Sequence, residues 1–176
     1  EIDVAVMVDR DPVMVPPLRA SETDNAIAGF VADYIADGAI LQVGIGAVPD
    51  AIMQLIADRR DLGIHSGMIG DSAVDLIERG VVTNATHGAW RGVSVTGALI
   101  GTERLYRFAH ENPAVLMCGS ATTHSEAVLS ALPGLVSINS AIEVDLTGQV
   151  NAEAAGGAYL GGTGGQVDYV RGASRS

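Results

Sequence analysis

The strongest constraint on the fold of this chain is the alternation of short apolar runs with stretches of helical periodicity. Short apolar runs bounded by glycine or proline are typical of buried strands, and apolar residues spaced three or four apart are typical of helices that pack on a sheet. Strand–helix units of this length favour an α/β fold, with a mostly parallel sheet covered by helices on both faces.

The predicted elements follow one another along the chain. Strands are predicted at Ile2–Val8, Ala39–Val43, Leu62–His65, Val81–Thr83, Val93–Ile100 and Val115–Cys118. Helices are predicted from the capping box Ser21–Asp24 to Ile35, and at Pro49–Arg60, Asp71–Arg79, Thr102–His110 and Thr123–Leu132. Beyond Pro133 apolar and polar residues alternate, Asp145–Gly148 is typical of a hairpin turn, and glycine becomes frequent. The chain is therefore expected to end in a glycine-rich β meander.

Charge and composition exclude several classes of function. The 176 residues suffice for a single domain with a sizeable core. The formal net charge of -11 argues against a nucleic-acid-binding protein, which needs clustered cations to neutralise phosphate. All 10 basic residues are arginine, and the absence of lysine excludes Schiff-base chemistry with pyridoxal phosphate and a Walker A phosphate loop.

The single cysteine and the short apolar runs bear on the compartment. Cys118 has no partner for an internal disulfide, and the sequence contains no cysteine-rich or His-Glu-x-x-His pattern, so no bound metal is expected. No apolar run approaches the ~18 residues of a membrane span, and no signal peptide opens the sequence. The expectation is a cytoplasmic protein without a membrane or nucleic-acid partner.

Gly44, Ile45 and Gly46 lie between a predicted strand and a predicted helix, as a dinucleotide-binding loop does. The Rossmann pattern needs a third small residue where this sequence has Pro49, and no acidic residue ends the following strand, so a nicotinamide cofactor is not expected. Such a loop still presents free N–H groups at a helix N-terminus, which suits a phosphate or an oxyanion. The alternative is a tight turn in which the glycines serve packing.

Three other segments each have a chemical and a structural interpretation. Ser72 resembles a hydrolase nucleophile, but no histidine stands in a recognisable relation to it, so Asp71 or Ser72 is better interpreted as a helix N-cap. His65 ends a strand at the carboxyl edge of the sheet, where side chains meet substrate, or it is a structural histidine. The cluster Gly161–Gly165 is either a turn or a place where bare backbone approaches a ligand.

Longer strings of residues resemble a known family. They are Asp37–Asp50 (DGAILQVGIGAVPD), Leu62–Ser66 (LGIHS), Gly80–Asn84 (GVVTN), Ser137–Asn151 (SINSAIEVDLTGQVN), Gly164–Asp168 (GGQVD) and Arg171–Ala173 (RGA). In this order they cover nearly the whole chain. The chain is similar to the second half of the acetyl-CoA hydrolase/transferase family, which includes the 4-hydroxybutyrate CoA-transferases.

The resemblance implies that residues 1–176 form a C-terminal CoA-transferase-like domain. Members of this family have two similar α/β halves with the active site between them. The N-terminal half and the last strands of the C-terminal half are therefore expected to be missing from this chain. The implied partners are acyl-CoA, small carboxylic acids and either an N-terminal half or a partner chain, in a homo- or hetero-oligomer.

By resemblance, the reaction is acyl transfer through an enzyme carboxylate. A glutamate attacks the acyl-CoA thioester to give an acyl-glutamyl anhydride, CoA thiolate returns to form a glutamyl-CoA thioester, and a second carboxylic acid collects the CoA. Coenzyme A is then a co-substrate, and no cofactor is bound. The positions implied for CoA contact are Gly44, Ile45, Gly46, Ala47 and Val48, which also supply part of the oxyanion hole, and on the opposite wall Ile142, Gly162, Gly164 and Gly165.

The chain departs from the family pattern at the nucleophile. The usual string is His-Ser-Glu-Met, whereas this sequence reads His65-Ser66-Gly67-Met68, and Gly67 has no side chain. Asp71, four residues on, is the candidate substitute. Three hypotheses follow: an enzyme that transfers CoA between carboxylic acids or hydrolyses short-chain acyl-CoA by an altered route, a non-catalytic acyl-CoA-binding paralogue, and a partner subunit for a chain with its own carboxylate.

Overall fold

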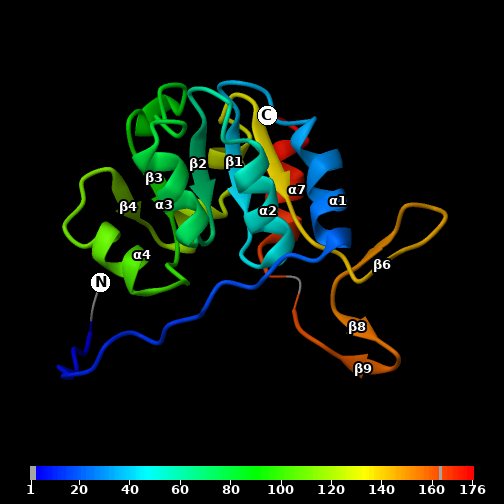
Figure 1. The fold of residues 1–176 in the computed structure, drawn as a ribbon, viewed down its shortest axis with the longest axis horizontal. Coiled ribbons are helices and arrows are strands. Elements are labelled where there is room, and N and C mark those ends of the chain that lie inside the picture. The colour runs from blue at the N-terminus through cyan, green and yellow to red at the C-terminus, as the bar shows by residue number, and fades with distance from the viewer. Residues whose placement is uncertain (1–2, 163) are drawn as a thin grey trace.

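The computed structural model describes residues 3–162 and 164–176. Five parallel strands form one sheet in the order β4-β3-β2-β1-β5, and two antiparallel hairpins follow β5 (Figure 1). The sheet strands are β1 (Ile40–Val43), β2 (Gly63–Ser66), β3 (Ser94–Thr96), β4 (Val115–Met117) and β5 (Leu135–Ile138). This arrangement confirms the predicted α/β class and its parallel sheet.

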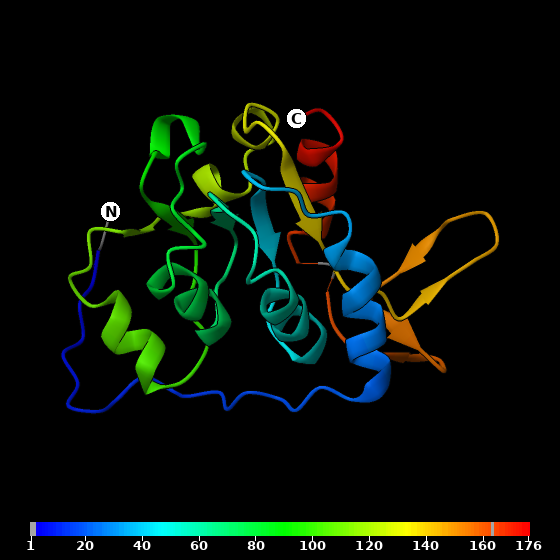
Figure 2. The ribbon, with the colours of Figure 1, turned by 45° about the horizontal axis from the view of Figure 1, so that its top comes forward.

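Helices cover both faces of the sheet, as predicted (Figures 1 and 2). The helices α1 to α4 lie on one face, and α6 and α7 pack behind β5 on the other. Their bounds are α1 (Glu22–Ala32), α2 (Ala47–Leu55), α3 (Asp71–Glu78), α4 (Glu103–Ala109), α5 (Ser120–Thr123), α6 (Glu126–Leu129) and α7 (Gln166–Ala173), with a 3-10 turn at Gly88–Trp90.

The buried apolar residues form one core on each face of the sheet. The larger core lies under α1, α2 and α3, where Leu41, Ile52 and Val74 are fully buried. The smaller core holds Leu129 and Tyr169 against the other face. Both faces of β1 are covered, and its residues Ile40–Val43 are nearly all apolar. The strands β2 and β3 also hold buried polar residues, among them His65, Ser66 and Thr96.

The crossovers change face at β1. The strands β2, β3 and β4 are added in chain order on one side of β1, and β5 then pairs with its other edge in register from Ile40–Leu135 to Val43–Ile138. In a doubly wound sheet this change opens a crevice beyond the carboxyl ends of the two strands, and ligands bind there. Gln42, Ser137 and Asn139 are joined there by hydrogen bonds, with Ser137 Oγ donating to Gln42 Oε1 at 2.7 Å.

The strand predicted at Ile2–Val8 is wrong for its described part, residues 3–8, which form neither helix nor strand. Residues 3–20 instead form an extended strap along the carboxyl edge of the sheet (Figure 2). The Val15 N–H donates to the Gly101 carbonyl at 2.9 Å, and the Tyr106 hydroxyl donates to the Val13 carbonyl at 3.0 Å. Apolar residues become a strand only beside a free strand edge, and this segment pairs with none among the described residues.

Two predictions in the middle of the chain are also corrected. Val81–Thr83 forms only an isolated bridge from Val82 to Leu62, because the chain turns away at Asn84, which has a φ of 54°. The helix predicted at Thr123–Leu132 is broken into α5 and α6, since His124 and Ser125 leave the helical conformation between them.

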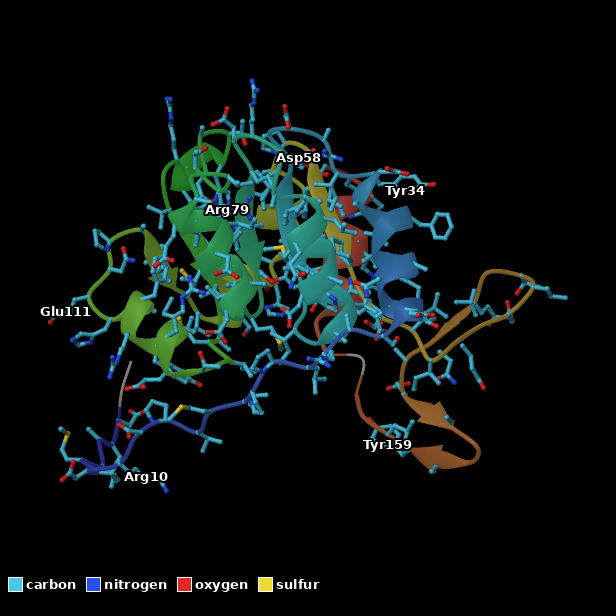
Figure 3. All side chains as sticks on the ribbon, in the orientation of Figure 1. Arg10, Tyr34, Asp58, Arg79, Glu111 and Tyr159 are labelled. Carbon is cyan, nitrogen blue, oxygen red and sulfur yellow. The ribbon has the colours of Figure 1, made fainter. Side chains whose placement is uncertain are left out.

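The glycine-rich C-terminal region contains the predicted meander and one unpredicted helix. The hairpins pair β6 (Glu143–Val144) with β7 (Val150–Asn151), and β8 (Ala154–Ala155) with β9 (Ala158–Tyr159). They form an arm that projects beyond the sheet, with Tyr159 on it and Glu111 at the opposite end of the molecule (Figure 3). The predicted turn at Asp145–Gly148 is confirmed, since Asp145 Oδ1 accepts from the Thr147 and Gln149 N–H groups. The helix α7, which follows the arm, was not predicted.

Candidate functional site

The loops after β1 and β2 meet at the carboxyl edge of the sheet. The buried Ser66 hydroxyl, at the end of β2, donates to the Val43 carbonyl at the end of β1, with a distance of 2.9 Å. A Cβ at Gly70 would lie 3.4 Å from the Ile45 side chain, so the loop 67–70 is in contact with the loop 44–46. The structure therefore brings together two of the segments that the sequence marks as functional.

The loop after β1 leads directly into α2. Gly46 has a φ of 119°, which a residue with a side chain rarely adopts, and it is the N-cap of α2 without a side-chain hydrogen bond to the helix. Ala47 and Val48 are the first helical residues, and Pro49 follows in the first turn. The N–H groups at the start of a helix have no intrahelical partner, so this loop can donate to an oxyanion.

Gly67 faces two side chains on the other face of the sheet. A Cβ at Gly67 would lie 2.9 Å from both Cε1 and Nε2 of His124 and 3.5 Å from the Tyr169 hydroxyl. A Cβ at Gly165, the N-cap of α7, would also collide with the His124 ring. The structure thus brings Gly67 and Gly165, which are 98 positions apart in the sequence, against the Nε2 end of one histidine ring. We call Gly67, Thr123, His124, Gly165 and Tyr169 the Gly67 cluster.

His124 and Tyr169 were not singled out in the sequence. Their rings meet edge to face with centroids 4.9 Å apart, and the buried Tyr169 hydroxyl has no hydrogen-bond partner among the described residues. Burial raises the pKa of this phenol far above its usual range. Neither residue belongs to a recognisable catalytic pattern, and only the fold of α5 and α7 places them beside Gly67.

The remaining predicted CoA contacts lie on the arm and its return. Ile142 precedes β6, is 40% exposed, and its N–H donates to the Asn151 carbonyl at 2.8 Å. Gly162 and Gly164 are exposed. Their contact with CoA stays a prediction.

Asp71 has a structural role that differs from the expected N-cap of its own helix. The N-cap of α3 is Gly70, without a side-chain hydrogen bond, and Asp71 is the first helical residue. Its carboxylate accepts from the Thr102 hydroxyl at 2.6 Å and from the Thr102 N–H at 2.8 Å. Asp71 therefore holds the start of α4, and both of its oxygens are already engaged. Its role as a substitute nucleophile stays a prediction.

A cavity of about 460 Å³, which we call the strap pocket, lies between the strap and the first turns of α2 and α3. Its walls include Ile45 and Gly46 and three carboxylates, those of Asp50, Asp71 and Asp75. Arg104 also lines it but pairs with Asp75 and with Glu78. The excess of negative charge opposes the binding of a phosphate group in this cavity.

Asp50 is expected to destabilise the fold at neutral pH. Burial raises the pKa of this carboxyl, and the nearby carboxylates of Asp71 and Asp75 raise it further. Because the native state disfavours the ionised form, Asp50→Asn should raise the midpoint of thermal unfolding at pH 7. The gain should shrink as the pH falls and Asp50 takes up its proton. Exposed Asp58→Asn is the control, and equal effects of the two variants would contradict this account.

His65 and His87 form a fully buried pair beneath the Gly67 loop. His65 Nδ1 lies 3.1 Å from His87 Nε2, His87 Nδ1 lies 3.0 Å from the Val93 carbonyl, and Trp90 packs edge-on against His65. The Val93 carbonyl can only accept, so His87 Nδ1 carries the proton and His65 Nδ1 donates to His87 Nε2. Burial, and then the proximity of His87, lowers the pKa of His65 to about 4. This geometry supports the structural interpretation of His65.

The buried pair predicts a loss of stability in acid. The pKa of His65 is about 4 in the folded state, against 6.5 for the free side chain. Between these pH values the unfolded chain takes up a proton that the native state refuses, so stability falls as the pH decreases through this window. His65→Asn, which keeps an N–H for His87, should flatten this pH dependence of the free energy of unfolding. Exposed His110→Asn should leave it unchanged, and an unchanged slope for His65→Asn would refute the prediction.

Within residues 3–162 and 164–176, no three His, Cys, Asp or Glu side chains are grouped so that they could bind a metal ion. No helix in that part of the chain has the length and apolarity needed to cross a membrane.

Comparisons with known proteins agree with the fold. Residues 101–176 match the family described as Acetyl-CoA hydrolase/transferase C-terminal domain. The chain is 40% identical over 91% of its length to a succinyl-CoA:acetate/propanoyl-CoA:succinate CoA transferase from Fasciola hepatica. It is 38% identical over its full length to the 4-hydroxybutyrate coenzyme A transferase of Clostridium kluyveri.

The structural match is similarly extensive. The crystal structure of 4-hydroxybutyrate CoA-transferase from Porphyromonas gingivalis superposes with a TM-score of 0.85 at 32% identity, covering 96% of this chain and 40% of that one. The chain spans only 34% and 41% of the length of the Fasciola and Clostridium relatives. Sequence and overall structure are similar to these relatives over nearly all of the chain, which therefore belongs to the acetyl-CoA hydrolase/transferase family.

Proposed function

We propose that this chain binds short-chain acyl-CoA at the carboxyl edge of its sheet and cleaves the thioester, either by hydrolysis or by transfer of CoA to a carboxylic acid. The observation that carries the proposal is the position of Gly44–Val48, directly after β1, where the crossovers of the sheet change face. Ligands of doubly wound sheets bind at this point. Contact between this loop and the Gly67 loop adds support.

We infer further that glycine at position 67 changes the chemical route. The resemblance gives the family a glutamate nucleophile there, and Gly67 cannot form an acyl-glutamyl anhydride. Water is then the available nucleophile, and hydrolysis is the reaction that needs no enzyme carboxylate. Donors for the oxyanion and binding of the CoA tail retain part of the rate enhancement when a nucleophile is absent.

We also propose that the chain acts as the C-terminal half of a two-half site. The relatives it matches are more than twice as long as the region they share with it. The remaining contacts to CoA would come from an N-terminal half or from a partner chain, in a homo- or hetero-oligomer. The strap pocket, with its three carboxylates, would accept at most an uncharged part of the substrate.

Calorimetric titration of CoA and acetyl-CoA, followed by measurement of free thiol over hours, tests the proposal. Binding with thiol release is expected. Binding without release would instead favour the non-catalytic paralogue, and absence of binding would overturn the proposal. Gly46→Val should weaken CoA affinity because Gly46 has a positive φ within the proposed site. Gly148→Val is the matched control, since Gly148 also has a positive φ but lies in the turn of the β6–β7 hairpin.

A further inference from the structure

The strap pocket shares part of its wall with the loop that we propose for CoA. Ile45 and Gly46 line the cavity, and Gly46 is also the N-cap of α2. The N–H groups of Ala47 and Val48, in the first turn of α2, have no intrahelical partner. A thioester carbonyl oxygen that accepts from them would place its acyl chain beside the cavity. The volume of about 460 Å³ is that of a small-molecule site.

Part of the wall of the strap pocket is apolar. The strap contributes Val15–Leu18 to it, and Ile100 adds to it from the loop after β3. The Val15 N–H donates to the Gly101 carbonyl at 2.9 Å, which holds the strap against this loop. An apolar wall favours hydrocarbon, because each methylene group that leaves water for it strengthens binding by up to about fourfold.

The polar part of the wall carries an excess of negative charge. Asp75 pairs with Arg104, but Arg104 also pairs with Glu78. Asp50 and Asp71 form no ion pair with a described residue. One guanidinium therefore faces several carboxylates, and the potential in the cavity is negative.

Asp50 itself responds to this charge. Burial raises the pKa of its carboxyl, a hydrogen bond from the Ser72 side chain opposes that rise, and the carboxylates of Asp71 and Asp75 raise the pKa again. A carboxylate on a ligand in the same cavity would meet the same repulsion, and the charge of Asp50 would add to it. An uncharged ligand group would not be repelled.

We propose that the strap pocket holds the acyl group of the bound acyl-CoA, and that Asp50 makes it select uncharged acyl chains over chains that end in a carboxylate. The inference rests on the proposed function, since it takes Gly44–Val48 as the CoA site. The apolar wall then favours acyl chains longer than acetyl, and the carboxylates disfavour the acyl group of a dicarboxylic acid.

Calorimetric titration with acetyl-CoA, butyryl-CoA and succinyl-CoA tests this selection without requiring turnover. Two added methylene groups should make butyryl-CoA bind about 10-fold more tightly than acetyl-CoA. Succinyl-CoA has an acyl chain of the same four carbons, and its terminal carboxylate should weaken binding at least 10-fold relative to butyryl-CoA, on the order of a close like-charge contact. Asp50→Asn should reduce this second ratio by about fivefold. Asp58→Asn removes the same charge from an exposed side chain outside the cavity and should leave the ratio unchanged.

Ile100→Ala supplies a second measurement. Removing this part of the apolar wall should lower the preference for butyryl-CoA over acetyl-CoA severalfold, whereas Ile27→Ala, an exposed isoleucine of α1, should leave it unchanged. Equal affinity of the unmodified chain for butyryl-CoA and succinyl-CoA would overturn the inference, as would an unchanged ratio in Asp50→Asn or an unchanged preference in Ile100→Ala. Absence of binding of all three esters would overturn the proposed function itself, which separates the two failures.

Discussion

Gly67→Glu is expected to give the chain CoA-transferase activity. The rate of acyl exchange between acetyl-CoA and a second carboxylic acid should rise by roughly 100-fold or more, because loss of the nucleophile lowers the rate of other enzymes by at least that factor. The new side chain would begin 2.9 Å from the His124 ring, so the ring must shift by a few tenths of an ångström. His124 is half-buried and follows the four-residue helix α5, which makes this shift possible. Mass spectrometry of the exchanged CoA esters measures the gain.

Gly67→Gln is the matched control for this experiment. Glutamine has the same size as glutamate and displaces His124 in the same way, but it does not form the anhydride. Exchange should therefore appear with glutamate alone. Equal exchange in both variants, or an inert glutamate variant that binds CoA normally, would show that the fold does not support the transferase route.

Asn84→Ala is expected to lower the free energy of unfolding by about 3 kcal/mol. The buried Asn84 amide accepts from the Ile64 N–H at 2.9 Å and donates to the Ser94 hydroxyl at 3.0 Å. Asn84 therefore links β2 and β3 at Ile64 and Ser94, one residue before their ladder begins at His65 and Val95. Alanine would leave two buried polar groups unpaired and would keep an unfavourable positive φ. Denaturant unfolding measures the change.

Asn84→Gly separates the two causes. Glycine also removes both hydrogen bonds but adopts the φ of 54° without strain. It should therefore be more stable than the alanine variant by about 1 kcal/mol. If alanine costs less than about 1 kcal/mol in total, the two hydrogen bonds do not stabilise the β2–β3 contact as argued.

The central strands could be predicted from the sequence, because a parallel sheet buried on both faces needs uninterrupted apolar runs. Ala39–Val43 and Leu62–His65 were each predicted within one residue of β1 and β2. Ile2–Val8 has a similar apolar content and still forms no strand over its described residues. Composition along a segment does not reveal whether a free strand edge will lie beside it, and here the predicted strand remains part of the strap.

The C-terminal errors have a different cause. Glycine lowers helix propensity, and α7 (Gln166–Ala173) lies in a glycine-rich segment, so the sequence did not predict a helix there. The helix α7 forms because Gly172 allows close approach to α6, where any Cβ would collide with Leu129, and because Tyr169 is buried against the sheet. Tertiary packing outweighs local preference at this helix.

Only part of the candidate site could be predicted from the sequence. The Gly44–Val48 loop was identifiable because a glycine turn between a strand and a helix has a known location in an α/β fold. The approach of His124 to Gly67 was not, because it depends on where α5 and α7 lie relative to β2. No spacing along the chain encodes that contact.

The pairing of β1 with β5 has a consequence for how the chain folds. One edge of β1 can pair soon after residue 63 leaves the ribosome, but the other must wait for Leu135, 95 residues beyond Ile40. Until then the central strand presents a row of unsatisfied amides, and such edges recruit other chains. Closing so long a loop is slow compared with forming the local strand–helix units. Refolding should therefore show early helix formation, a late step that seats β5, and yields that fall as protein concentration rises.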